Sequence, residues 1–210
     1  MGVSFIDDAP QIIKDYLFYM QTVKGKSQKT VDEYYIDLRT FFRFIKLQRG
    51  LVPEDAEFES ISIADVDLEL VKTITLNDAY EFMNYIQRER NNQNVTRARK
   101  CSSLKGYFNY LTTKKCVLST NPVEQLEVPK KKKALPKYLT LEQSLELLNA
   151  VDGDYKERDY CILTLFLNCG LRVSEMASLN YTDIRQDNTL RVVGKGNKER
   201  FVYFGTACRK

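Results

Sequence analysis

The sequence contains no histidine among its 210 residues. This absence excludes a Ser-His-Asp triad, a zinc site of the HExxH type and a histidine general base within these residues. No run of 18 or more apolar residues occurs, so we expect no membrane-spanning helix. The opening residues, MGVSFIDDAPQIIKDY, lack the basic segment and apolar core of a signal peptide. Chemistry must therefore come from arginine, lysine, carboxylate, tyrosine, serine or cysteine side chains.

The cysteine pattern gives no sign of a disulfide framework. The five cysteines are an odd number and include no Cys-x-x-Cys pair. This favours reduced thiols in a cytoplasmic protein over disulfides or a zinc site, and we expect no metal. The five are Cys101, Cys116, Cys161, Cys169 and Cys208.

Positive charge is concentrated in one segment, although the net charge of the chain is only +4. Residues 93–137 hold eleven lysines or arginines and two acidic residues, a balance of +9 that leaves −5 for the remainder. Such asymmetry is typical of a basic surface that meets a polyanion. A solvated charged linker is the alternative interpretation. Because some of these cations lie on a patterned helix, we favour nucleic acid.

Helical periodicity dominates residues 1–128, which we predict to be a four-helix domain. Thr30 and Glu33 have the spacing of a capping box, in which two side chains satisfy free N–H groups at a helix start. The helices are expected at about 9–22, from Thr30, from Thr75 and at about 95–114, with a long acidic connection and a short helical turn at 49–74.

Two of these helices carry cations or small polar residues away from their apolar faces. The apolar stripe of the fourth helix consists of Cys101, Leu104, Phe108 and Leu111. Ser102, Ser103 and Gly106 then point away from the stripe, while Lys100 and Lys105 flank it. Such a face lets a helix approach phosphates closely, although an ordinary amphipathic helix has the same pattern. The candidate nucleic-acid contacts are Arg39, Arg43, Arg99, Lys100, Ser102, Ser103 and Lys105.

Residues 129–137 form a basic segment that we predict to be an interdomain linker. Pro129 and Pro136 bracket a lysine run, and this composition resists both helix and sheet. A nuclear localisation signal is the other conventional interpretation of such a run. The position between two folded segments favours the linker.

Residues 138–210 show a different pattern and are predicted to be a second domain. Thr140 and Gln143 have capping-box spacing. Residues 158–169 are apolar on nearly all sides, which predicts a deeply buried helix. So buried a helix in a segment of 73 residues suggests that part of the core is missing, as in a truncated domain. Two β-type runs, 189–193 and 200–204, predict a hairpin.

Two motifs of this second domain carry a family resemblance. Residues 169–179 read CGLRVSEMASL and residues 190–200 read LRVVGKGNKER, with 23 positions between Arg172 and Lys195. They resemble the tyrosine recombinases of the Xer and phage-integrase type, in which such segments hold the first catalytic arginine and the catalytic lysine. Residues 27–41 and 96–111 are similar to the DNA-binding core of that family, so the resemblance spans essentially the whole chain.

The resemblance implies a mainly α fold. An N-terminal four-helix core-binding domain of the SAM-like type would precede the first part of an α+β catalytic domain with a small β-hairpin. It also implies a clamp around double-stranded DNA, cleaved and rejoined through a tyrosine-phosphate intermediate without metal or cofactor. Active relatives work as tetramers on two DNA sites. This chain lacks their C-terminal segments, so we expect a monomer, located with the nucleoid in the cytoplasm.

The resemblance assigns catalytic roles to Arg172 and Lys195, and the residues around them suggest roles for Glu175, Lys198 and Arg200. Arg172 would stabilise charge on the phosphate oxygens, for which a planar guanidinium at a helix start is suited. Glu175, one turn along, would orient Arg172 or help close the start of the helix; a surface carboxylate is the alternative. Lys195 would protonate the leaving oxygen as a general acid. Without the Arg172 motif, its position would indicate only a solvated lysine in a turn. Lys198 and Arg200 would touch the DNA backbone or solvent.

Several family elements have no counterpart in the sequence. A His-x-x-Arg segment, a further His or Trp, and a tyrosine in the context of the nucleophile are absent from the 210 residues. We therefore expect these residues alone to be inactive or nearly so. One hypothesis is a fragment of a recombinase, and another is a naturally short DNA-binding relative that blocks or guides a full-length partner. A generic basic adaptor for RNA or protein would leave Arg172 and Lys195 unexplained.

Overall fold

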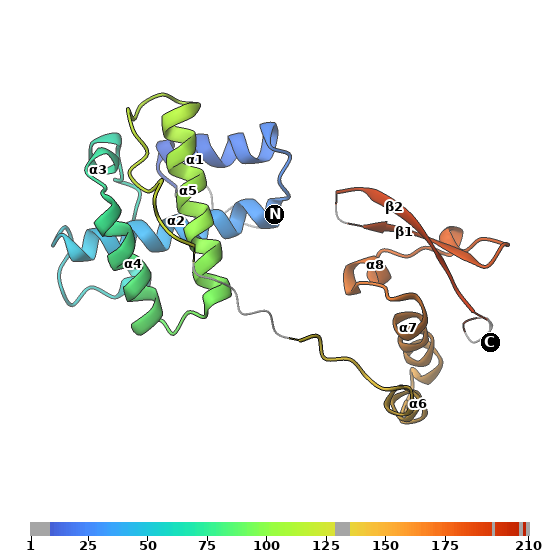
Figure 1. Ribbon diagram of the computed structural model, residues 1–210. Helices are drawn as coiled ribbons and strands as arrows, with labels where there is room; N and C mark the ends of the chain where they lie inside the picture. Colours follow the sequence, from blue (N-terminus) through green and yellow to red (C-terminus); the bar gives the residue numbers. More distant parts are fainter. Residues whose placement is uncertain (1–8, 129–134, 195, 206–207, 209–210) are drawn as a thin grey trace. The chain divides into compact units, whose positions relative to one another are not determined.

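The computed structural model describes residues 9–128, 135–194, 196–205 and 208. They belong to two compact units, Met1–Ala134 and Leu135–Lys210 (Figure 1). The described residues are mainly helical, with a two-stranded antiparallel sheet in the second unit. The predicted fold class is thus confirmed. The proposed domain limits stay a prediction, and residues 129–134 of the predicted linker lie outside the described residues.

The first unit contains the four predicted helices. The connection at 49–74, for which one short helical turn was predicted, holds a 3-10 turn and a short helix. Its elements are α1 (Gln11–Phe18), a π-helical turn (Tyr19–Val23), α2 (Gln28–Gln48), a 3-10 turn (Phe58–Ser60), α3 (Leu68–Lys72), α4 (Leu76–Arg88) and α5 (Asn94–Thr113). The first, second, third and fourth predicted helices correspond to α1, α2, α4 and α5. The 3-10 turn and α3 lie in the acidic connection.

Helix α2 begins earlier than the sequence pattern predicted. Ser27 is its N-cap, and the Ser27 carbonyl accepts hydrogen bonds from the N–H groups of Thr30 and Val31. The predicted capping box of Thr30 and Glu33 is therefore wrong, because Thr30 already lies inside the first helical turn. Its hydroxyl instead lies 3.0 Å from the Ser27 hydroxyl.

Aromatic rings fill the core of the first unit. Helix α2 packs against α1, α4 and α5, and α5 runs across it (Figure 1). Phe41 of α2 lies edge-on to Phe82 of α4, with ring centroids 5.2 Å apart, and to Phe108 of α5, at 6.4 Å. All three rings are fully buried. Edge-to-face packing of this kind stabilises a core beyond the burial of apolar area.

Helix α5 approaches α1 closely at a glycine. A Cβ atom built on Gly106 would lie 2.6 Å from the hydroxyl oxygen of Tyr16, whose ring is buried. The prediction that Gly106 points away from the packed face is therefore wrong. The glycine makes room for a tyrosine side chain of the neighbouring helix.

In the described part of the second unit, three α-helices and a 3-10 turn accompany a hairpin. Its elements are α6 (Leu141–Asn149), α7 (Lys156–Cys169), α8 (Val173–Ala177), a 3-10 turn (Tyr181–Asp183), β1 (Thr189–Gly194) and β2 (Lys198–Tyr203). The predicted capping box of Thr140 and Gln143 begins α6: the Gln143 N–H donates to the Thr140 hydroxyl, and the Thr140 N–H donates to the Gln143 side chain. In the antiparallel hairpin Gly194 pairs with Lys198.

The predicted deep burial of α7 is wrong for the described residues. Of its side chains only Thr164 and Cys169 are buried, while Cys161 is exposed. Leu165 and Phe166 pack on a small cluster that includes Leu171, Leu190, Val192 and Phe204. Helix α6 also contacts α7, but most of the α7 side chains stay at least partly exposed, and a pocket of about 690 Å³ opens beside the helix, lined also by α8 and β1.

We predict that Phe41→Ala lowers the free energy of unfolding by about 3–5 kcal/mol, because a deleted core ring leaves a cavity. Urea denaturation of the 210-residue chain, followed by circular dichroism, measures this loss. Phe18 of α1, which is 54% exposed, provides the control; its replacement by alanine should change stability by no more than about 0.5 kcal/mol. Equal losses for the two variants would contradict the assigned core.

Candidate functional site

The second unit holds Arg172 at the start of α8 through a buried carboxylate. Arg172 is the N-cap of this helix, and its backbone N–H donates to Oε2 of Glu175 at 2.8 Å. Its Nη1 donates to Oε1 of the same carboxylate at 2.7 Å. The Glu175 side chain is only 2% exposed, whereas 70% of the Arg172 side chain is exposed. The predicted contact is thus present, and it leaves most of the guanidinium open to solvent.

Arg200 of β2 reaches the same carboxylate from the hairpin. Its Nη1 donates to Oε1 of Glu175 at 2.6 Å, and its Nη2 donates to Oε2 at 2.9 Å. Hydrogen bonds from Arg200 and from the Arg172 backbone hold the pKa of the Glu175 carboxyl well below its usual range, although desolvation opposes them. Two guanidinium groups therefore share one carboxylate, which leaves a local excess of positive charge.

The remaining predicted residues of the hairpin lie near this pair in sequence. Lys195 lies outside the described residues, so its role stays a prediction. Gly194, which precedes it, ends β1 next to the carboxylate: a Cβ atom there would lie 3.2 Å from Oε1 of Glu175. Lys198, the first residue of β2, is exposed. Arg200 was expected to touch the DNA backbone or solvent, but its guanidinium donates two hydrogen bonds to the Glu175 carboxylate.

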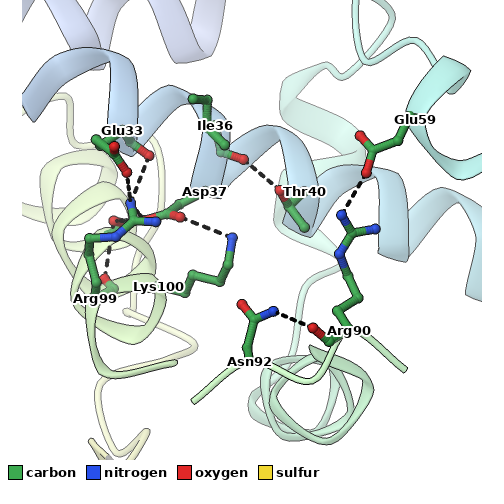
Figure 2. A network of polar contacts seen from close by, with 10 residues as sticks. Glu33, Ile36, Asp37, Thr40, Glu59, Arg90, Asn92, Arg99 and Lys100 are labelled. Carbon is green, nitrogen blue, oxygen red and sulfur yellow. Dashed lines mark hydrogen bonds and ion pairs between the residues drawn. The ribbon is translucent and has the colours of Figure 1, made fainter. Parts of the chain in front are cut away.

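In the first unit, several predicted contacts converge on a buried aspartate between α2 and α5 (Figure 2). Asp37 is fully buried, and its Oδ2 accepts hydrogen bonds from Arg99 Nη1 and from the Ser103 hydroxyl, both at 2.7 Å. Its Oδ1 accepts from Lys100 Nζ at 3.0 Å. Arg99 also pairs with Glu33 at 2.8 Å. The network therefore ties α5 to α2 by charge.

The structure differs from the expectation that Ser103 points away from the apolar stripe of α5 and that Lys100 only flanks it. Lys100 and Ser103 are buried, because both are needed to satisfy Asp37. Arg43 is buried as well: its Nε donates to the Ile61 carbonyl at 2.8 Å, and its Nη1 pairs with Glu59 at 2.6 Å. Burial is the main cause that lowers the pKa of Arg43. In this conformation the polar groups of Lys100, Ser103 and Arg43 bind partners within the protein.

The other predicted contacts of the first unit keep some exposure. Arg39 and Arg99 are half-buried, and the Arg39 guanidinium lies over the ring of Tyr35, 5.3 Å from its centroid. Ser102 is exposed. Lys105 is half-buried, and its Nζ donates to the Leu126 carbonyl at 3.1 Å.

Asp37 is the residue that sequence reasoning missed. Its spacing to Phe41 and Ile45, four and eight positions on, places it within the apolar stripe of α2. An acidic residue inside such a stripe needs buried partners, and this signal could have assigned Lys100 to the interior. Among the described residues no three His, Cys, Asp or Glu side chains gather as metal ligands. None of the helices that the structure describes is long and apolar enough to cross a bilayer.

Comparison with known proteins gives matches in sequence over both units. The family model described as the phage integrase family matches residues 137–210. Tyrosine recombinase XerC of Caldanaerobacter subterraneus subsp. tengcongensis is 49% identical over 201 residues, covering 96% of this chain and 57% of the relative. XerC of Thermodesulfovibrio yellowstonii is 32% identical, with 94% and 59% covered. The chain thus spans less than two thirds of the length of these curated relatives.

Solved structures share the fold. The XerH site-specific recombinase, bound to its difH substrate in a pre-cleavage complex, has a TM-score of 0.59 and 17% identity, covering 90% of this chain and 53% of that one. The Tn1549 transposon integrase with circular intermediate DNA has a TM-score of 0.54 and 19% identity, covering 95% and 63%. At these identities the likeness concerns the fold.

The Asp37 network yields a prediction about stability. Asp37→Ala should lower the free energy of unfolding by about 3–5 kcal/mol, because Lys100 would stay buried without a counter-charge. Glu33→Ala removes a carboxylate from the same Arg99, but this side chain is 43% exposed, so the variant should cost at most about 1 kcal/mol. Urea denaturation of both variants measures the difference. An equal loss of unfolding free energy in the two variants would contradict the stabilising role of buried Asp37.

The Glu175 pair yields a prediction about pH. Because its folded pKa is lowered, the carboxylate stabilises the second unit above the ordinary glutamate pKa of 4.5, and this contribution is lost as the pH falls below that value. Hydrogen exchange of the β1 and β2 amides at decreasing pH should show the loss. Glu175→Gln should remove this part of the pH dependence, whereas Glu157→Gln, at an exposed position on α7, should retain it.

Proposed function

This chain belongs to the phage integrase family, among the Xer-like tyrosine recombinases, and on that premise we propose that it binds duplex DNA and serves site-specific recombination. The observation that carries the proposal is the Arg172 guanidinium, 70% exposed while its backbone and one N–H group are anchored on buried Glu175. An anchored, exposed guanidinium is suited to bind a phosphate with its remaining donors.

The proposed reaction is phosphoryl transfer without metal or cofactor. A tyrosine hydroxyl gives its proton to solvent and its oxygen forms a bond to the scissile phosphorus. The bond from phosphorus to the 5′ oxygen breaks, and Lys195 supplies the proton that this oxygen takes up. Arg172 stabilises the negative charge that grows on the non-bridging oxygens. None of the thirteen tyrosines in the sequence is assigned as the nucleophile. Rejoining is the reverse transfer to a new 5′ hydroxyl.

For the 210 residues by themselves we propose DNA binding without cleavage. They contain no histidine, and Arg172 and Lys195 polarise and protonate but do not attack. In a longer protein the missing groups would complete the reaction, and the active assembly would be a tetramer on two DNA sites. A short regulator that occupies recombination sites would bind in the same way, so cleavage by the product of the complete reading frame distinguishes the two.

The proposed DNA face of the first unit is smaller than the sequence suggested. Arg39, Ser102 and Lys105 keep exposed surface, and Arg99 keeps part of its own. Lys100 and Arg43 are left out of the proposal, because their charges are satisfied internally. Contacts of this kind to phosphates would set position and affinity, with little dependence on DNA sequence.

We predict covalent capture of DNA that depends on Arg172. Duplexes recovered from a random pool by the 210-residue chain would provide the site, and a nicked copy of that site would trap a protein–DNA adduct. The product of the complete reading frame should form the adduct, while Arg172→Ala should bind equally well and form none. Normal cleavage by Arg172→Ala would refute the assigned chemistry. Binding with no adduct from any form would support the regulator.

Lys105→Gln should weaken DNA binding and reduce its salt dependence. One lost phosphate contact lowers the slope of log K against log salt by about 0.9. Fluorescence anisotropy at several salt concentrations measures both quantities. Lys72→Gln on α3 serves as the control, since it removes an exposed lysine that pairs with Glu69. A slope unchanged by Lys105→Gln, or changed equally by Lys72→Gln, would contradict the proposed face.

A further inference from the structure

Arg200 donates hydrogen bonds to the same Glu175 carboxylate as Arg172, but the reaction proposed above gives Arg200 no role. Arg200 lies on β2, whereas Arg172 and Glu175 belong to the start of α8. Both carboxylate oxygens accept one hydrogen bond from Arg172 and one from Arg200. The arginine of the hairpin thus occupies half of the acceptor sites of a buried anion.

This division leaves the Arg172 guanidinium available. Arg172 meets the carboxylate with its backbone N–H and Nη1, so Nε and Nη2 have no protein partner among the described residues. Without Arg200, two acceptor sites of a carboxylate that is 2% exposed would be empty, a state that costs desolvation energy without compensation. Arg172 is the cation next to them, and turning inward to a two-pronged contact would fill them. Its outward donors would then be lost.

Gly194 supplies an independent observation on the same pair. A Cβ atom at this position would lie 3.2 Å from Oε1 of Glu175 and 3.7 Å from Nη1 of Arg200. The backbone of Gly194 is in a strand and does not have a positive φ, so its conformation does not require glycine. The missing side chain makes room for the ion pair, which shows that strand β1 is packed around it.

We propose that Arg200 is a positioning residue for the strand-cleavage reaction. By filling half of the acceptor sites of Glu175, it keeps the Arg172 guanidinium turned outward to the scissile phosphate. The inference rests on the proposed function of Arg172. Arg200 itself need not touch DNA.

Chemical modification tests the orientation of Arg172 without any cleavage. Phenylglyoxal modifies accessible arginines, and mass spectrometry of the digested 210-residue chain reports its rate at Arg172. Arg200→Ala should lose reactivity at Arg172, and Arg200→Lys should retain part of it. Arg191→Ala is the matched control, because Arg191 lies on the same hairpin but pairs with Glu199 of β2 and with Asp183 of the preceding 3-10 turn. An unchanged or faster modification of Arg172 in Arg200→Ala would overturn the proposal.

Cleavage kinetics test the consequence for the reaction. With the product of the complete reading frame and saturating nicked duplex, Arg200→Ala should slow adduct formation about 100-fold, the loss expected for a misplaced reacting group. Its affinity for DNA should be unchanged, and Arg200→Lys should recover part of the rate. Arg191→Ala should cleave normally. Normal cleavage by Arg200→Ala while Arg172→Ala is inactive would overturn this proposal alone, whereas normal cleavage by Arg172→Ala would overturn the proposed function.

Gly194→Ala keeps the test decisive if the Arg200 variants fail to fold. This variant retains every charge but crowds the ion pair, so it should slow cleavage and lower the reactivity of Arg172 toward phenylglyoxal. Gly205→Ala is the matched control, since a Cβ atom there would meet nothing within 4 Å. A Gly194→Ala protein that matches Gly205→Ala in both measurements would also refute the role of Arg200.

Discussion

A carboxylate that leaves water must receive hydrogen bonds from the protein, because an unpaired buried charge costs several kcal/mol. Each unit of this chain contains such a group. Asp37 draws Arg99, Lys100 and Ser103 to the junction of α2 and α5. Glu175 draws an arginine from α8 and another from the hairpin. These two anions determine which of the nearby cations are buried and which stay exposed.

Charge counted along the sequence therefore differs from charge presented in space. The segment 93–137 has a balance of +9, but two of its cations neutralise Asp37 and Glu33, which come from α2. Lys115 similarly pairs with Asp15 of α1. The same constraint acts differently at Glu175, where 70% of the Arg172 side chain stays exposed. A buried carboxylate can draw a cation into the interior, as Asp37 does with Lys100. It can also hold a cation at the surface, as Glu175 does with Arg172 while Arg200 fills its other acceptor sites.

Most local patterns predicted local structure correctly, although the capping box of Thr30 and Glu33 was wrong because α2 already begins after Ser27. The capping box of Thr140, the helix after Thr75 and the Arg172–Glu175 contact all depend on residues within one helical turn, and the structure contains them. Partners 16 to 63 positions apart were not predicted, as for Arg43 with Glu59 and Lys100 with Asp37. The apolar run of α7 predicted burial, but burial depends on neighbouring elements, and composition does not specify which of them are present.

The contact of Gly106 with Tyr16 joins two helices through the smallest residue and a phenol oxygen. A side chain at position 106 would force the hydroxyl at position 16 to shift, while loss of that hydroxyl leaves space that a methyl group could fill. The two positions thus form a coupled pair, although 90 residues separate them in the chain. Among related sequences, this geometry disfavours alanine at position 106 together with tyrosine at position 16, so a change at one position would constrain the other.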